Sequence, residues 1–201
     1  MCGCSVRIAS GLLPALLLTL TSAAPAAAEE LRAQEATLLH RRLPLRELQR
    51  QVAGEWRSYT LPTAKLLVIN LWSTRCKPCI EEMPFLRRLA AGWRGEHGVR
   101  FLFVADPPEE NPEAELQAFW RPRGSPLHGE ELLRSSDGAL RAALDTGVEP
   151  ITLLVDSDRV VRQAFVGSVV RRGAELAAAM TRLLQILPAA RARHRATSPE
   201  L

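Results

Sequence analysis

Cysteine is scarce in this sequence, and half of it lies at the extreme N-terminus. Of four cysteines in 201 residues, two occur within the first four positions, and Cys76 and Cys79 are the other two. A structural zinc site usually needs four ligands, either two cysteine pairs or one pair with clustered histidines. The four histidines show no such spacing. The sequence therefore argues against a structural metal site, and a domain of this length can fold without a disulfide.

A continuous basic stripe is also missing. The 26 lysines and arginines and the 22 acidic residues interleave along most of the chain, with a net charge of +4. No nucleic-acid-binding module and no internal repeat is recognisable, so we expect no nucleic-acid partner. The densest basic run, residues 191–195, belongs to a segment, 189–201, that we expect to form a flexible tail. Weak contact of this tail with an anionic membrane surface is the alternative.

The N-terminal segment has the layout of a secretory signal peptide. A start that carries a single charge, Arg7, is followed by an apolar stretch and by the small residues Ala26–Ala28, directly before two glutamates. This pattern predicts cleavage after residue 28, export to the periplasm or another extracytoplasmic compartment, and a soluble mature chain. An uncleaved membrane anchor is the alternative, but Pro14 and Pro25 favour cleavage. Loss of residues 1–28 would leave Cys76 and Cys79 as the only cysteines.

Hydrophobic patterning predicts an α/β fold. The chain divides into an N-terminal extension, residues 29–60, and a domain, residues 61–188. Residues 31–60 are polar and irregular, apart from a short helical period at 44–52. Continuous apolar runs predict buried strands, and 3.6-residue periods predict helices. The predicted strands cover residues 65–72, 98–106 and a hairpin at 151–167, and the predicted helices cover residues 78–93, 111–120, 137–146 and 173–187. This order favours a mixed central sheet with helices on both faces.

The two remaining cysteines are too close together to act as a staple. A bridge from Cys76 to Cys79 closes almost no loop, so it would stabilise the fold little. Cys76 follows a predicted buried strand and opens a predicted helix, where backbone N–H groups favour negative charge. Arg75 and Lys77 should favour a Cys76 thiolate further. Cys79 lies one helical turn on and should be more buried, so it can attack a mixed disulfide formed at Cys76.

The segment 70–84, NLWSTRCKPCIEEMP, resembles the active-site segment of exported thiol–disulfide oxidoreductases of the TlpA/ResA/CcmG type. The matching positions are Asn70, Leu71, Trp72, Cys76, Pro78, Cys79, Glu82 and Pro84. The resemblance implies a thioredoxin-like fold and electron exchange with protein dithiols and disulfides. It also implies that Cys76 is the nucleophile, that Cys79 resolves the mixed disulfide, and that the redox-active cysteine pair replaces any dissociable cofactor.

Two further residues gain a role from this resemblance. Pro150 occupies the position of a cis-proline that shapes the groove for an extended substrate peptide. An ordinary trans proline at a strand entrance is the alternative. Glu82 matches a buried glutamate that manages protons at the cysteine pair, since a desolvated carboxylate can accept a proton from a thiol. The alternative is an exposed helix acid like Glu81.

The sequence also departs from the family pattern. Arg75 stands where many relatives carry an aromatic residue, and Glu149 precedes Pro150, where a small or apolar residue is commoner. A carboxylate at Glu149 would oppose a thiolate at Cys76, or it could pair with Arg75 across the substrate-binding site. Trp72 is expected to pack beneath the active-site loop, with substrate contact as the alternative.

The resemblance implies a reductant, for example on cytochrome c precursors, that is served by a dithiol electron donor. Copper delivery is the alternative function, because two thiolates and a soft third ligand can hold Cu(I). Met83 is the nearby candidate for that ligand, although a methionine at a helical core position is usually a packing residue. A non-catalytic substrate-holding module would have lost a cysteine, and both are present.

Overall fold

The computed structural model describes residues 23–52, 55–93, 98–106, 111–120 and 131–188. Their elements follow the order α1 (Ala23–Leu38), β1 (Leu48–Val52), β2 (Glu55–Ser58), β3 (Leu66–Trp72), α2 (Lys77–Gly92), β4 (Val99–Ala105), α3 (Glu113–Trp120), β5 (Glu131–Ser135), α4 (Ala139–Leu144), β6 (Ile151–Asp156), β7 (Val161–Val166), the 3₁₀ turn η3 (Val170–Arg172) and α5 (Gly173–Ile186).

These strands form one mixed sheet of seven strands in the order β2-β1-β5-β4-β3-β6-β7. The central strands β3, β4 and β5 are parallel, as expected for strands joined through helices. The hairpin of β6 and β7 is antiparallel, and β6 pairs with β3 in the antiparallel direction. The predicted mixed sheet with an α/β architecture is therefore confirmed.

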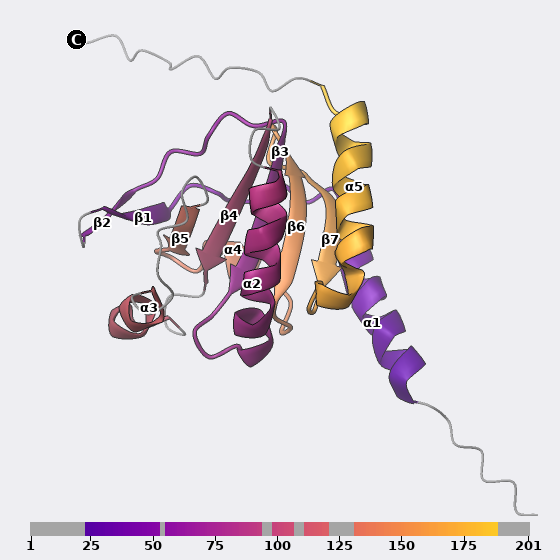
Figure 1. Cartoon of the computed structure of the whole chain (residues 1–201), viewed down its shortest axis with the longest axis horizontal. Coiled ribbons are helices and arrows are strands. Elements are labelled where there is room, and N and C mark those ends of the chain that lie inside the picture. Colours follow the sequence, from indigo (N-terminus) through magenta and orange to yellow (C-terminus); the bar gives the residue numbers. More distant parts are fainter. Residues whose placement is uncertain (1–22, 53–54, 94–97, 107–110, 121–130, 189–201) are drawn as a thin grey trace, which may run out of the picture.

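Strand β3 shows why helices cover both faces of the sheet. All seven of its residues are buried, and successive side chains of a strand point to opposite faces. Leu67, Ile69 and Leu71 pack with residues of α1 and α4 on one face. Val68 and Trp72 pack with residues of α2 and α5 on the other. In Figure 1, α2 lies in front of the strands and α4 lies behind them.

The prediction for residues 31–60 is wrong in two respects. The segment is not irregular, since it contains the end of α1 and the strands β1 and β2. The short helical period at 44–52 does not form a helix, because Leu48–Val52 pairs with β5 and extends the sheet. The leucines that set this period, Leu45 and Leu48, are buried in the core instead. A helical period of three apolar residues gives only a weak local preference, and pairing with a neighbouring strand outweighs it.

The predicted signal peptide falls largely on residues 1–22, which lie outside the described residues, and the end of this segment, 23–28, opens α1. Helix α1 packs along β7: the backbone N–H of Val166 donates to the Glu35 carboxylate at 2.9 Å. Within the described part of the chain, no helix combines the length and the apolar character needed to span a membrane. The predicted basic tail, 189–201, also lies outside the described residues.

Candidate active site at the start of helix α2

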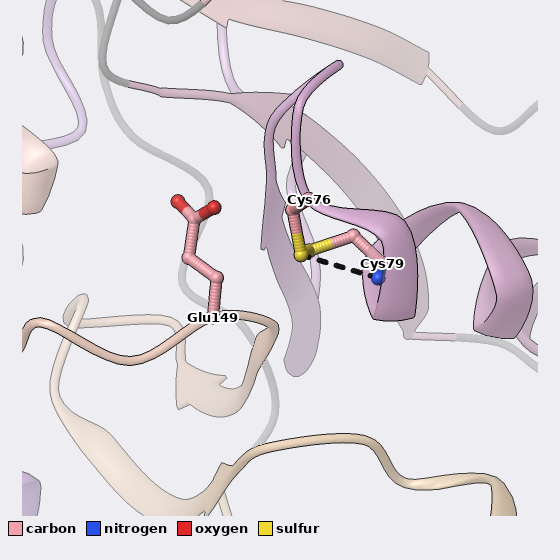
Figure 2. Close-up of side chains that lie close together, drawn as sticks. All are labelled: Cys76, Cys79 and Glu149. Atoms are coloured by element: carbon pink, nitrogen blue, oxygen red, sulfur yellow. Dashed lines mark hydrogen bonds between the residues drawn. A yellow bond between two sulfur atoms is a disulfide. The ribbon is translucent and has the colours of Figure 1, made fainter.

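The cysteine pair lies where β3 ends and α2 begins. Trp72 is the last residue of β3, and Cys76 is the N-cap of α2. The backbone N–H of Cys79 donates to Cys76 Sγ at 3.2 Å, so the sulfur takes one of the donors left unpaired at a helix start. The two cysteines form a disulfide, with their Cα atoms 5.2 Å apart (Figure 2). The predicted position of Cys76 at a helix N-terminus is confirmed.

The two sulfurs differ in their access to solvent. Cys76 is partly exposed, whereas Cys79 has 0% exposure and belongs to the core cluster beneath α2. The bulky Trp72 side chain is fully buried in the same cluster, which supports the packing role and argues against contact with substrate. A partner molecule can therefore reach Cys76 but not Cys79, as expected if Cys76 attacks and Cys79 resolves.

Glu82 lies one turn beyond Cys79 on the buried face of α2. Its side chain has 0% exposure, so the alternative of an exposed helix acid is wrong. Glu82 Oε1 accepts a hydrogen bond from Asn70 Nδ2, and Oε2 accepts one from the backbone N–H of Val169, both at 2.9 Å. Burial raises the pKa of Glu82, and these hydrogen bonds offset part of the rise. Asn70 Nδ2, on β3, also donates to Thr152 Oγ1 of β6 at 3.1 Å, so Asn70 connects Glu82 of α2 to β6.

Glu149 faces the cysteine pair from the loop before β6 (Figure 2). The Glu149–Pro150 peptide bond is cis, which is the conformation predicted. A carboxylate oxygen of Glu149 and the sulfurs of Cys76 and Cys79 all lie within 4.8 Å of one another. The side chain is only 8% exposed. The predicted proximity of this carboxylate to the thiolate position is therefore correct.

The charged partner of Glu149 is Arg141, and not Arg75, which the sequence offered as an alternative. Glu149 forms an ion pair with Arg141 of α4, and Ser73 Oγ donates to its second oxygen at 3.0 Å. Arg75, the partner considered as an alternative, is exposed. Arg141 and Ser73 were missed by sequence reasoning. Arg141 is far from the cysteines in the chain, and its short helix shows no pattern beyond helical periodicity.

The basic residues beside Cys76 point outward. Lys77 is 86% exposed, and its Nζ lies 3.7 Å from a carboxylate oxygen of Glu81 on the next turn. Arg75 is exposed as well. Exposed charges are screened by water and salt, so the help that these two residues give to a thiolate is smaller than their place in the sequence suggests.

Among the described residues, one cluster brings three potential metal donors together: Cys76, Cys79 and Glu149. The Glu149 carboxylate is already held by Arg141, and a carboxylate is a poor ligand for Cu(I), which prefers thiolates and thioethers. Met83, the thioether considered for copper, is 4% exposed and packs in the core beneath α2. The three side chains are therefore best described as a dithiol beside an ion-paired carboxylate, and we assign no metal to this cluster.

Comparison with known proteins places these features in a wider group. No protein-family model matches the chain. The thiol:disulfide interchange protein DsbE of Haemophilus influenzae is 28% identical over 146 residues, which cover 70% of this chain and 73% of that protein. The thiol–disulfide oxidoreductase ResA of Geobacillus kaustophilus is 29% identical over 111 residues, covering 55% of this chain and 60% of that protein.

Solved structures show the same fold. A putative thiol:disulfide interchange protein DsbE from Chlorobium tepidum matches with a TM-score of 0.55 and 16% identity, over 73% of this chain and 99% of that chain. StoA from Bacillus subtilis matches with a TM-score of 0.54 and 15% identity, over 68% of this chain and 98% of that chain.

The sheet order, the helix-capping Cys76 and the disulfide to Cys79 define the class: this is a thioredoxin-fold protein with a Cys-x-x-Cys pair. Together with the two sequence relatives, they support a thiol–disulfide oxidoreductase that is similar to the TlpA/ResA/CcmG type.

Proposed function

We propose that the chain works outside the cytoplasm as a reductant of disulfides in other proteins, with cytochrome c precursors as the example that the resemblance suggests. A dithiol protein supplies its electrons. The observation that carries this proposal is the asymmetry of the pair: Cys76 is reachable and caps a helix, while the bonded Cys79 is fully buried. The proposed location rests on the signal-peptide pattern in residues 1–28.

The reaction needs only the two cysteines and the substrate disulfide. In the reduced protein, the Cys76 thiolate attacks one sulfur of the substrate, and the other substrate sulfur leaves as a thiolate. Cys79, after losing its proton, attacks Cys76 Sγ, and the second substrate sulfur leaves. The substrate has then gained two electrons, and its two sulfurs are protonated by the proton that Cys79 lost and by one proton from solvent. The Cys76–Cys79 disulfide has formed. A donor dithiol reduces this disulfide by the reverse exchange.

The neighbouring residues have supporting roles in this proposal. Glu82 assists in removing the proton of Cys79, because its burial raises the pKa of its carboxyl toward that of a thiol. Pro150 shapes the groove in which a substrate segment lies beside Cys76. Glu149 borders the same groove, and its carboxylate lies within 4.8 Å of the sulfurs. No dissociable organic cofactor takes part.

Substitution of each cysteine tests the assigned roles. In an assay of protein-disulfide reduction with dithiothreitol as the electron donor, Cys76→Ser should abolish turnover. Cys79→Ser should still attack but accumulate mixed disulfides through Cys76, since no resolving thiol remains. Turnover by Cys76→Ser at the wild-type rate would refute the proposal, and so would the absence of mixed disulfides with Cys79→Ser.

The same preparation separates electron transfer from copper delivery. Reduced wild-type protein is titrated with Cu(I) against a competing chelator, and its disulfide-reducing activity is measured in parallel. Turnover together with weak Cu(I) binding supports the proposed reductase. Tight stoichiometric Cu(I) binding without disulfide turnover would instead support the copper alternative.

A further inference from the structure

The Glu149 carboxylate lies beside both sulfurs and is largely shielded from solvent, so its charge acts strongly on them. It lies within 4.8 Å of Cys76 Sγ and Cys79 Sγ, and its side chain is 8% exposed. When the disulfide is reduced, any negative charge that forms on Cys76 must lie close to this carboxylate. Two like charges repel more strongly in such a partly buried site than in water. Glu149 therefore opposes the thiolate that the start of α2 favours.

Arg141 limits this opposition. Its guanidinium pairs with Glu149 and is 20% exposed, so this ion pair is screened less than a surface pair. Its backbone N–H donates to Oδ2 of the buried Asp106 at 2.6 Å. Burial raises the pKa of Asp106, while the hydrogen bond and the charge of Arg141 lower it part way. Asp106 thus fixes the backbone of Arg141 in α4, while the Arg141 side chain holds Glu149 in place.

The other charged groups around the cysteine pair either are exposed to solvent or are held by hydrogen bonds beneath it. Lys77 and Arg75 are exposed, and Lys77 is near Glu81. Glu82 lies beneath the pair, and both of its oxygens accept hydrogen bonds. Among the described histidine, aspartate and glutamate side chains, only Glu149 forms a cluster with both sulfurs.

We propose that the Arg141–Glu149 ion pair sets the reducing strength of the cysteine pair. Glu149 raises the free energy of the Cys76 thiolate, so the reduced protein gives up its electrons more readily. The positive charge of Arg141 offsets part of this effect. Both are positioning residues that act through their charge on Cys76. The proposal rests on the proposed function, and it explains how a site with a helix N-terminus at Cys76 can serve a reductant.

The electron balance shows where the charge matters. Reduction of the Cys76–Cys79 disulfide by a dithiol takes up two electrons and breaks one S–S bond, while the donor forms its own disulfide. The two protons of the donor pass to the cysteines or, where Cys76 remains a thiolate, one passes to solvent. Glu149 acts only on the form in which Cys76 is charged, so its effect on the redox equilibrium must grow as the pH exceeds the thiol pKa.

Glu149→Gln is the decisive variant, because it removes the charge while an amide oxygen can still accept from Arg141 and Ser73. Two unit charges about 5 Å apart near a protein surface change an ionisation constant by roughly a hundredfold, and Arg141 offsets part of this. We expect the Cys76 ionisation constant, from the pH dependence of alkylation, to rise by roughly tenfold, which lowers the thiol pKa. Arg141→Met should change it in the opposite direction.

The redox equilibrium provides the second readout. With dithiothreitol at a pH above the thiol pKa of both proteins, Glu149→Gln should favour the reduced form by roughly tenfold, or about 30 mV. At a pH well below both pKa values the two proteins should agree. Glu115→Gln is the matched control: this exposed carboxylate accepts from Thr74 of the active-site loop at 2.7 Å, and its loss should change neither quantity.

The possible outcomes separate this inference from the proposed function. A wild-type pair that does not equilibrate with dithiothreitol would overturn the proposed function itself. If the wild type equilibrates but Glu149→Gln leaves both the thiol pKa and the potential unchanged, or raises the pKa, only the role of the ion pair is refuted. If Arg141→Met does not fold, Glu149→Gln and Arg141→Lys still decide, because the lysine variant should remain close to the wild type.

Discussion

Glu82 is a buried carboxyl whose ionisation should weaken the fold. Burial raises its pKa above the ordinary value of 4.5, and the hydrogen bonds from Val169 and Asn70 offset only part of this rise. The folded chain therefore keeps this proton to a higher pH than the unfolded chain does. For this group, the free energy of unfolding should fall as the pH rises from about 4.5 through the folded-state pKa, and then remain level.

Glu82→Gln removes the ionisation and keeps the shape of the side chain. The glutamine Oε1 can accept from the N–H of Val169, as Glu82 Oε2 does. Its Nε2 can donate to Oδ1 of Asn70, which is buried without a hydrogen-bond partner, once the Asn70 amide turns over. Each unit by which burial raises the pKa corresponds to about 1.4 kcal/mol. We expect the variant to gain on the order of 1–3 kcal/mol at pH 8 and little at pH 4.5.

Urea unfolding of the oxidised protein between pH 4.5 and pH 8 measures this difference. The matched control is Glu81→Gln, one residue earlier in α2, whose side chain is 64% exposed and pairs with Lys77. Asp106, which also has a raised pKa, contributes equally to all three proteins. The reasoning is refuted if Glu82→Gln is less stable than the wild type at pH 8, or if it shows the same decline with pH.

Three further substitutions test the packing and the ion pairs of the fold. Gly173→Ala should destabilise the fold by about 1–3 kcal/mol in thermal or urea unfolding, because a Cβ atom would lie 2.5 Å from the Phe85 ring; an unchanged midpoint would contradict this. Arg172→Met should cost about 3 kcal/mol, since it leaves the buried carboxylate of Glu35 without its ion pair. A loss below about 1 kcal/mol would show that the pair is not needed. Arg57→Gln should change stability by less than about 0.5 kcal/mol, because this ion-pairing side chain is 66% exposed, and a larger loss would count against that view.

Local signals in the sequence were sufficient for the centre of the molecule. The continuous apolar run of β3 and the helical period after Cys76 predict the strand and helix that place the cysteine pair, and the structure has both. The hairpin at 151–167 was also predictable, because two apolar runs flank a short polar turn. These elements carry their own patterns, so no knowledge of their partners was needed.

The edge of the sheet depended on partners that the sequence does not reveal. Strand β1 contains only two apolar residues, Leu48 and Val52, and it becomes a strand by pairing with β5 and β2. Helix α1 begins within the segment whose small apolar residues indicated a signal peptide. Tertiary pairing overrides weak local preference in such segments.

The residues of the candidate site also fall into two groups: those that the sequence predicts and those that only tertiary packing brings together. Cys76, Cys79 and Glu82 share one helix, so their spacing predicts that they lie together. Glu149 could be suspected from its place before Pro150. Its partner Arg141 could not be, because only the packing of α4 brings that side chain to the loop before β6.

The most direct test of the central claim is an equilibrium redox titration of the Cys76–Cys79 pair in mixtures of reduced and oxidised dithiothreitol. The fraction of free thiols is read by mass after alkylation. A single two-electron transition is predicted, at a potential closer to roughly −270 mV than to −120 mV. Sulfurs that stay fully oxidised or fully reduced at every ratio would contradict the assignment of an electron-carrying pair.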